Sequence, residues 1–455
     1  MNLNELVLAY QEPMIQALQE NVRIPSVQGE ALPDAPYGAC VRDSLLHALK
    51  IADQLGFRTV NLDNHIGWAE FGEGEEMIAV LGHLDVVPEG EDWSCEPYGG
   101  EIIGGKIMGR GTTDDKGPTI ASLFAMAALR DSGIKLRRRV RVILGCNEET
   151  GSQDVKHYLA CGGEIPVMGF TPDGAYPVIH GEKGIITTVL GADYSQTGDL
   201  ILTEIRGGTA SNVVPEYAWA RFQCNDAVFR SITVKDPKVR ITREETGFLL
   251  EAFGVSAHGS TPEQGENAIG RLLMAMSSLP LCANLAEKVQ FLAKHIGMEC
   301  DGVSAGIGLC DEPSGKLSLN LGTIEGNAAS LQFVINYRYP VTFSYEDCGP
   351  AFNGLFTENG FRILREFHKE KLYIPIDSQL VTSLMKVYKE QTGRNEQPTC
   401  IGGGTYAKSI PNLLAFGPVF PGDEVREHQS DEYITIDNLL KNAQIIAHAM
   451  LELAK

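Results

Sequence analysis

Short apolar runs alternate with longer helical patterns in the first third of the chain. Residues 3–18 carry apolar side chains at helical spacing, and residues 118–129 form an Ala-rich apolar segment that follows Gly117 and ends before Gly133. Three short apolar runs have the length of buried strands: residues 77–81, 140–144 and 167–170. Strand, helix and strand at this spacing predict an α/β domain with a mixed, largely parallel sheet and helices on both faces.

The pattern changes between residues 184 and 375. Four segments there resemble half-exposed strands, at residues 184–192, 248–255, 317–323 and 331–337, and one clear helix covers residues 267–279. The α/β pattern then returns, with helices at 377–391 and 437–453 and a strand at 412–416. We therefore predict a first domain in two parts, residues 1–183 and 376–455, interrupted by an inserted α+β domain at residues 184–375.

Composition and charge exclude several classes of protein. The 455 residues are 43% hydrophobic, which is enough to form buried cores and argues against intrinsic disorder. Lys and Arg number 38 against 59 Asp and Glu, a formal net charge of −21 that would repel nucleic acid and anionic lipid. The Arg-rich segment 137–141 is better explained as a solvated strand entrance. We expect neither a nucleic-acid partner nor a membrane partner.

We expect no targeting segment in this chain. No Lys or Arg precedes Arg23 and no cleavage site follows an apolar core, which argues against a signal peptide. No stretch reaches the ~18 uncharged apolar residues of a membrane span. The ten cysteines are scattered without a C-x-x-C pair, as expected for reduced thiols. These features predict a cytoplasmic protein.

Each predicted buried strand of the first domain ends in residues that can bind a metal. His83 and Asp85 follow the first strand, Glu148 and Glu149 the second, and Asp173 the third. The carboxyl ends of parallel strands meet at one edge of a sheet, so we expect these side chains to share one crevice. Two further candidates are the Asp114–Asp115 pair before the helix and His428 near the end of the chain.

Each motif by itself has an ordinary structural explanation. His83 and Asp85 project from the same face of an extended chain and could simply be a hydrogen-bonded pair. Glu148 and Glu149 could lie in a solvated loop, and the Asp114–Asp115 pair could cap a helix. Asp173 could belong to an ordinary turn. Their shared position at strand and helix ends favours a functional site instead.

Counting charges points to metal ions. Five carboxylates in one cleft would raise one another's pKa values until the site lost part of its charge. The five are those of Asp85, Asp114, Glu148, Glu149 and Asp173. Two divalent cations, ~3.5 to 4 Å apart, would balance most of that charge. Histidine and carboxylate ligands suit Zn²⁺ or Mn²⁺, and the residue types do not separate the two.

The motifs also occur together in a known order. They are His-Leu-Asp-Val-Val-Pro at 83–88, Gly-Arg-Gly-Thr-Thr-Asp-Asp-Lys-Gly-Pro at 109–118, Asn-Glu-Glu-Thr-Gly at 147–151, Pro-Asp at 172–173 and Glu-His at 427–428. The ordered set resembles the co-catalytic zinc metallopeptidase family of aminoacylase, acetylornithine deacetylase, succinyl-diaminopimelate desuccinylase, carnosinase and dipeptidases. It covers nearly the whole chain, and the Asp-Asp-Lys-Gly-Pro form with the long insert is most similar to the PepV-type bacterial dipeptidases.

This resemblance implies a two-metal exopeptidase-like catalytic domain with an inserted lid domain. It implies two divalent metal ions, Zn²⁺ first and Mn²⁺ as the alternative. The implied ligands are His83 and Asp173 on one ion, Glu149 and His428 on the other, and Asp114 between them. The peptide bond from Asp114 to Asp115 would be cis.

The resemblance also implies residues that act on the substrate. Glu148 would be the general base that takes a proton from the attacking water and later protonates the leaving amine, and Asp85 would hold His83. In the insert, His258 matches a lid histidine that donates a hydrogen bond to the developing oxyanion.

Three further residues resemble groups that bind the substrate carboxylate. They are Asn212, Arg338 and Gly403. Arg offers a planar two-point contact, although an Arg near a strand end is as often part of a surface ion pair. The Gly402–Gly404 loop would let backbone N–H groups approach the substrate, and no Gly-Lys-Ser/Thr follows it as a P-loop requires.

We predict metal-dependent hydrolysis of unblocked dipeptides by a water that two metal ions activate, with a small peptide as the substrate. The alternative within the family is an N-acyl amino acid deacylase or a carboxypeptidase, because the metal site is shared. A non-catalytic peptide-binding protein would not need Glu148 or His258, and surplus carboxylates disfavour a phosphoesterase. PepV-type lids resemble two fused halves, so we predict a monomer.

Overall fold

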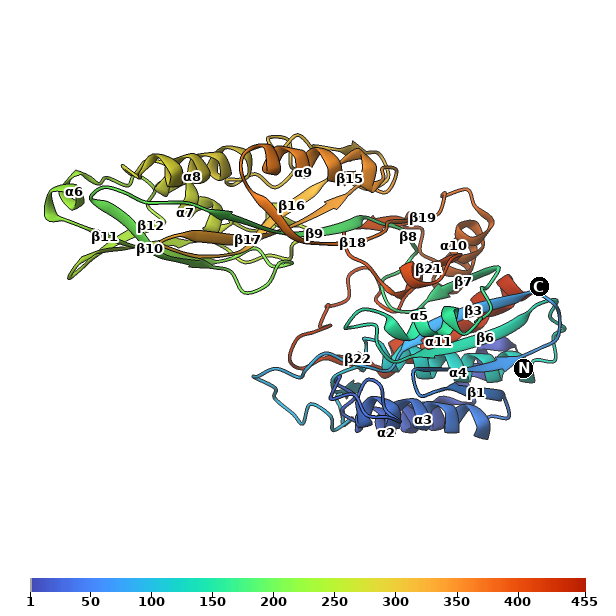
Figure 1. The fold of residues 1–455 in the computed structure, drawn as a ribbon. Coiled ribbons are helices and arrows are strands. Elements are labelled where there is room, and N and C mark those ends of the chain that lie inside the picture. Colours follow the sequence, from blue (N-terminus) through green and yellow to red (C-terminus); the bar gives the residue numbers. More distant parts are fainter. Residues whose placement is uncertain (1) are drawn as a thin grey trace. The chain divides into compact units, whose positions relative to one another are not determined.

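The computed structural model describes residues 2–455, which divide into two units (Figure 1). Unit 1 contains the residues up to 180 together with 374–399 and 404–455, and unit 2 contains 181–373 and 400–403. The sequence placed the domain boundaries after residues 183 and 375 and did not separate residues 400–403 from the second part of the first domain. Each unit has its own hydrophobic core.

A mixed sheet forms the centre of unit 1. Its middle strands β6, β3, β7 and β21 are parallel, whereas β1 and β2 on one side and β8 on the other are antiparallel. The mixed α/β fold predicted from the sequence is confirmed, with its parallel part confined to these middle strands. The bounds are β1 Arg58–Leu62, β2 Ile66–Phe71, β3 Met77–His83, β6 Arg139–Gly145, β7 Met168–Thr171, β8 Ile179–Glu182, β20 Thr399–Ile401 and β21 Leu413–Ala415.

Helices α4 and α11 pack against β3, β6 and each other, and α5 lies on the other side of the sheet (Figure 1). Helix α4 is buried from Lys116 to Leu129, and its Ala and Gly residues take up little space, which allows close packing on all sides. The helices of unit 1 are α1 Leu3–Leu8, α2 Gln11–Val22, α3 Ala39–Gln54, α4 Lys116–Asp131, α5 Gln153–Ala160, α10 Gln379–Thr392, η3 Tyr406–Ser409 and α11 Ile436–Ala454.

A small sheet of three strands joins distant parts of unit 1. Its order is β22-β5-β4, with bounds β4 Ile102–Ile103, β5 Lys106–Met108 and β22 Tyr433–Thr435. Strand β22 pairs antiparallel with β5, so that Tyr433 lies opposite Met108. The segment that follows His428 is thereby held beside the segment that precedes Asp114.

Unit 2 contains an eight-stranded antiparallel sheet in the order β12-β13-β11-β10-β16-β17-β9-β18. Its bounds are β9 Gly184–Asp193, β10 Leu200–Gly207, β11 Tyr217–Cys224, β12 Val239–Glu244, β13 Gly247–Phe253, β16 Ser318–Asn327, β17 Ser330–Tyr339 and β18 Arg362–Lys369. Shorter strands are β14 Cys310–Asp311, β15 Gly315–Lys316 and β19 Leu372–Tyr373. The predicted α+β character of the insert is thus present.

Helices α7, α8 and α9 cover one face of this sheet (Figure 1). The prediction of one clear helix was therefore incomplete. The helical segments are α6 Asp226–Ser231, η1 Pro262–Gln264, α7 Ala268–Met276, α8 Ala283–His295, η2 Tyr345–Asp347 and α9 Gly349–Glu358. Across residues 2–455, no helix combines the length and apolar character needed to cross a membrane.

Candidate functional site

Three adjacent parallel strands of unit 1 end at the same edge of the sheet. Strand β3 ends at His83, directly opposite Gly145 at the end of β6, and β7 ends at Thr171 on the other side of β3. Glu148, Glu149 and Asp173 follow these strand ends within a few residues. The parallel register therefore brings together side chains that are far apart in the sequence.

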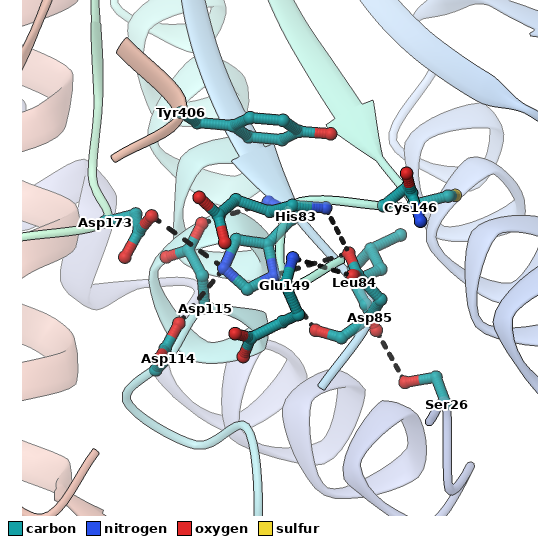
Figure 2. Close-up of polar contacts among 12 residues, drawn as sticks. Ser26, His83, Leu84, Asp85, Asp114, Asp115, Cys146, Glu149, Asp173 and Tyr406 are labelled. Atoms are coloured by element: carbon teal, nitrogen blue, oxygen red, sulfur yellow. Dashed lines mark hydrogen bonds and ion pairs between the residues drawn. The ribbon is translucent and has the colours of Figure 1, made fainter. Parts of the chain in front are cut away.

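The imidazole and carboxylate groups at this edge lie close enough to bind the same metal ion (Figure 2). His83 Nε2 is 3.0 Å from Asp114 Oδ1 and 3.9 Å from Asp173 Oδ2. His428 Nε2 is 2.9 Å from Asp114 Oδ2 and 3.2 Å from Glu149 Oε1. Two sets each have ligand atoms within 4.8 Å of one another: His83, Asp114 and Glu149, and His83, Glu148 and Asp173.

These separations and donor types fit divalent metal ions. Two donors bound at about 2.0–2.1 Å to one tetrahedral Zn²⁺ lie about 3.3 Å apart. The observed separations fall between 2.9 and 3.9 Å. Asp114 Oδ1 lies near His83 and Asp114 Oδ2 lies near His428, as expected for a carboxylate between two ions.

The site has more negative charge than its histidines balance. Burial raises the pKa of Glu148 well above its usual range, and Asp173 raises it further. Burial also raises the pKa of Glu149, with Asp114 adding to the effect. Hydrogen bonds to Asp114 and Glu149 raise the pKa of His428 to about 11. A cation at this position would therefore be stabilised by its surroundings.

Asp85 makes more contacts than sequence reasoning assigned to it. His83 Nδ1 lies 2.9 Å from the Asp85 carbonyl oxygen and 3.5 Å from Asp85 Oδ1. The two carboxylate oxygens of Asp85 also accept hydrogen bonds from the backbone N–H groups of Glu148, at 3.2 Å, and Glu149, at 3.1 Å. Asp85 thus connects the His83 ring to the segment that carries both glutamates.

The segment around Asp114 is organised by Glu432, which the sequence analysis did not single out. Glu432 is fully buried, and its Oε1 accepts hydrogen bonds from three backbone N–H groups, those of Gly111, Thr113 and Asp114, at 3.0–3.2 Å. Its Oε2 forms an ion pair with the buried Arg110 at 2.7 Å. No sequence spacing indicates these partners, because they are backbone amides brought close by the fold.

Asp115, named in the sequence as part of the Asp114–Asp115 pair, and Tyr406, which the sequence did not reveal, both contact His83. The peptide bond from Asp114 to Asp115 is cis, as the resemblance implied. Asp115 Oδ2 accepts a hydrogen bond from the His83 backbone N–H at 3.1 Å. The Tyr406 ring meets the His83 ring edge to face at 5.9 Å (Figure 2). The Tyr406 hydroxyl donates to Asp154. Asp154 in turn accepts from the Cys146 N–H at 2.6 Å.

The candidate substrate residues lie in unit 2, where the segments that carry Asn212 and His258 contact each other. The Gly259 N–H donates to the Asn212 carbonyl at 2.7 Å, and the neighbouring residues His258 and Val213 form a β-bridge. A side chain at Gly259 would lie within 3.0 Å of the Asn212 backbone, so glycine permits this close approach. His258 and Asn212 are both exposed.

Arg338 is buried and contacts the glycine loop of the same unit. Its guanidinium Nη1 donates to the Gly402 carbonyl at 2.6 Å, and its Nε donates to Asn336 at 3.2 Å. Burial lowers the pKa of Arg338 to about 10, so it stays charged at neutral pH. The adjacent Gly403 is half-buried. The surface ion pair considered for Arg338 is absent among the described residues.

Comparisons with known proteins agree on a family. A family model described as peptidase family M20/M25/M40 matches residues 79–452. "Putative dipeptidase YtjP" of Bacillus subtilis is 37% identical over the whole of both chains. Two solved structures are similar in fold at 15% identity and a TM-score of 0.60. The alignment with human carnosine dipeptidase 1 covers 99% of this chain and 98% of that protein. The alignment with the M20 family metallo-carboxypeptidase Sso-CP2 of Sulfolobus solfataricus covers 97% of this chain and 99% of that protein.

Proposed function

This chain belongs to peptidase family M20/M25/M40, a family of metal-dependent peptidases, and we propose that it is a dinuclear metallo-dipeptidase acting on unblocked dipeptides. The observation that carries the proposal is the position of Glu148. Its carboxylate belongs to the ligand cluster of His83 and Asp173, yet the cluster contains enough other ligands for the ions. The whole-length similarity to a relative named as a dipeptidase supports this choice of substrate.

In the proposed mechanism, His83 and Asp173 would hold one ion, Glu149 and His428 would hold the other, and Asp114 would serve both. Bound ions of this kind lower the pKa of water and polarise a carbonyl group. Zn²⁺ suits these ligands, with Mn²⁺ as the alternative.

Glu148 takes a proton from the attacking water and passes it to the leaving amine. Burial and the neighbouring Asp173 raise the pKa of Glu148 above its usual range, which favours a carboxyl group that both accepts and donates a proton. Asp85 orients His83 and the backbone of Glu148. In the same proposal, His258 donates a hydrogen bond to the oxyanion, and Asn212, Arg338 and Gly403 bind the substrate carboxylate.

Replacing Glu148 tests this mechanism directly. Glu148→Ala and Glu148→Gln should lower kcat for Ala-Ala by a factor of about 10² to 10⁴, the usual contribution of a general base. Their metal content, measured by atomic emission after dialysis, should stay near that of the wild type. Glu30→Ala, at an exposed carboxylate outside the cluster, is the matched control and should keep full activity. Wild-type rates in both Glu148 variants would contradict the proposed base.

A substrate panel separates the dipeptidase from the alternative within the family. We expect Ala-Ala to be hydrolysed with a higher kcat/KM than N-acetyl-Ala or Ala-Ala-Ala. The panel should be run after chelation and separate reconstitution with Zn²⁺ and Mn²⁺, so that the metal and the substrate preference are measured together. Preference for N-acetyl-Ala would show a deacylase, and preference for longer peptides a carboxypeptidase.

We also propose that the protein acts as a monomer in the cytoplasm. Unit 2 forms its eight-stranded sheet from a single chain, which supports a lid complete in one molecule. All ten cysteines are free, which supports a reducing compartment. Sedimentation should give the mass of one chain, and mixed Glu148→Ala and His258→Ala proteins should stay inactive. Activity restored by mixing would reveal that active sites are shared between chains.

A further inference from the structure

We propose that Asn320 and Asn336 are positioning residues that make unit 2 select peptides with a free C-terminal carboxylate. They act through Asn212 and Arg338, so the inference rests on the proposed function and on the carboxylate-binding role proposed for those two residues. All four residues lie in unit 2. Neither Asn320 nor Asn336 needs to touch the substrate, because each contacts a group that would.

The two asparagines lie directly opposite each other in the sheet of unit 2. Asn320 on β16 pairs with Asn336 on β17, and residues in such a pair have Cβ atoms about 4.5–5.5 Å apart. Their sequence neighbours Leu319 and Tyr337 belong to the hydrophobic core of the unit. Because side chains alternate along a strand, both asparagines project from the other face of the sheet. Both are nevertheless buried, so the partners of their amide groups decide their role.

Asn320 holds the turn that carries Asn212. Its Nδ2 donates to the carbonyl oxygens of Ser211 and Val213, both at 2.9 Å, so the amide contacts the residues on either side of Asn212. Its Oδ1 accepts from Asn267 Nδ2 at 3.2 Å. Both amide hydrogens of Asn320 are thus used on this turn. They fix the backbone from which the exposed Asn212 side chain projects.

Asn336 orients the guanidinium group of Arg338 without neutralising it. Arg338 Nε donates to Asn336 Oδ1 at 3.2 Å, and Asn336 Nδ2 donates to Thr187 Oγ1 at 2.8 Å, which keeps the amide oxygen toward Arg338. The other partner of Arg338 is the Gly402 carbonyl, at 2.6 Å. Both partners are neutral, and no carboxylate that the structure describes forms an ion pair with this buried cation. Arg338 therefore keeps its charge available for an anionic ligand.

A second buried group beside Arg338 is free to bind a ligand. Ser318 on β16 lies directly opposite Arg338 on β17, and its hydroxyl makes no hydrogen bond with any residue that the structure describes. Buried hydroxyl groups are normally hydrogen-bonded, so an unpaired one beside a guanidinium without a counter-ion favours a ligand at this place. A carboxylate suits both groups, because it accepts from hydroxyl and guanidinium donors alike. The C-terminal carboxylate of a peptide is such a ligand.

Two neighbouring strands therefore connect two recognition groups that come from separate segments. The Asn212 turn is attached to β16 through Asn320, and Arg338 is part of β17 and is held by Asn336. The spacing of paired strands sets the relative position of the two groups. A peptide whose C-terminus is an amide would leave the buried Arg338 without an anion, so it should bind weakly.

A charge introduced at Asn336 tests the inference. Asn336→Asp keeps the size of the side chain and places a carboxylate beside Arg338, where it would pair with the guanidinium in place of the substrate. The KM for Ala-Ala should rise about 10- to 100-fold with little change in kcat, as expected when a charge-assisted hydrogen bond is lost from the bound substrate and the transition state alike. Ala-Ala amide should be a poor substrate of the wild type, and its hydrolysis should be nearly unchanged in the variant.

A second variant tests the contact with the Asn212 turn. Asn320→Asp cannot donate to both carbonyl oxygens, so the KM for Ala-Ala should again rise while hydrolysis of the amide stays the same. Hydrogen–deuterium exchange at the Gly259 N–H, which donates to the Asn212 carbonyl, should become faster. Asn284→Asp, at an exposed position on α8 of the same unit, is the matched control and should keep wild-type kinetics and exchange.

The possible results separate this inference from the proposed function. Equal losses toward Ala-Ala and its amide in both variants would show that the two asparagines only stabilise the fold. An unchanged KM for Ala-Ala in Asn336→Asp, or a wild type that hydrolyses the amide as well as Ala-Ala, would also overturn the inference and leave the Glu148 mechanism standing. Wild-type protein that hydrolyses neither peptide would overturn the proposed function, and this inference with it. If circular dichroism shows that Asn320→Asp does not fold, Asn336→Asp alone decides.

Discussion

At the residue scale, the structure assigns a tautomer to His258. The backbone N–H of Ser260 donates to His258 Nδ1 at 3.3 Å, and the Ser260 hydroxyl lies 2.6 Å from the same nitrogen. A ring nitrogen that accepts a hydrogen bond has no proton of its own, so in the neutral ring the proton is on Nε2. His258 can then present an N–H donor, which its proposed role at an oxyanion requires.

Ser260 is therefore expected to be a positioning residue for His258. Ser260→Ala removes the hydroxyl and should lower kcat for Ala-Ala about 3- to 10-fold with little change in KM, because an oxyanion donor acts mainly in the transition state. Ser260→Thr keeps the hydroxyl and should recover most of the rate. Steady-state kinetics on the three proteins measure this. A change in KM alone would instead indicate a role in binding substrate.

The sequence predicts residues whose chemistry is visible in their type and order, and it does not predict those that act through the fold. His83, Asp114 and Glu149 could be named from motifs, and the fold brings their ligand atoms within 4.8 Å. Glu432 could not, because most of its partners are backbone N–H groups of another segment. In the sequence, a buried carboxylate of this kind cannot be distinguished from a solvated one.

At the element scale, helix and strand prediction succeeded where burial is continuous along the element. Helix α4 and strand β3 are buried along most of their length and produce continuous apolar runs. Strand β18 is an edge strand that exposes most of its side chains, so its sequence has no apolar alternation. Helix α8 differs, since Leu285, Val289 and Leu292 do recur at helical spacing, and its signal was present in the sequence.

The buried Glu432 side chain joins the segment that carries Asp114 to the segment that carries His428. Glu432→Ala leaves three backbone N–H groups without their acceptor and the buried Arg110 without its carboxylate partner. We therefore expect a lower Tm and a metal affinity reduced about 10- to 100-fold, as for other outer-shell partners of metal ligands. Competition with a chelator measures the affinity, at a temperature where circular dichroism shows both proteins folded.

A matched control for this variant lies on the same segment. Glu424 is exposed and pairs with Arg426, so Glu424→Ala should leave metal affinity unchanged. Glu432→Gln keeps an acceptor oxygen for the backbone N–H groups and should lie between wild type and Glu432→Ala. If Glu432→Ala lowers Tm but binds metal as tightly as the wild type, Glu432 stabilises the fold without positioning the ligands.

At the scale of the whole molecule, charge and metal content should be linked through stability. The chain has a formal net charge of −21, and several of its acidic groups are buried together around Asp114. Ions that bind the folded state and not the unfolded one stabilise it by mass action. Chelation should therefore lower the Tm, and the loss should depend on pH.

The direction of that pH dependence follows from groups whose pKa is raised in the metal-free folded protein. Burial, with Asp114 and Asp173 nearby, raises the pKa of Glu427 from 4.5 to about 8. Between these values the folded state binds more protons than the unfolded state, so the free energy of unfolding falls as pH rises, by at most about 1.4 kcal/mol per pH unit for each proton. His428, with its pKa raised from 6.5 to about 11, acts in the same direction above pH 6.5.

We accordingly expect chelated protein to have a lower Tm at pH 8 than at pH 6, and metal-saturated protein to show a smaller difference. The pKa of Asp114 is lowered, through hydrogen bonds from His428 and His83 that outweigh its burial, so its contribution is lost only in acid and does not change across this range. Differential scanning calorimetry of both forms at the two pH values measures the effect. A chelated protein that is equally stable at both, or more stable at pH 8, would show that the buried carboxylates at this edge do not titrate together, and the electrostatic argument for bound cations would lose its support.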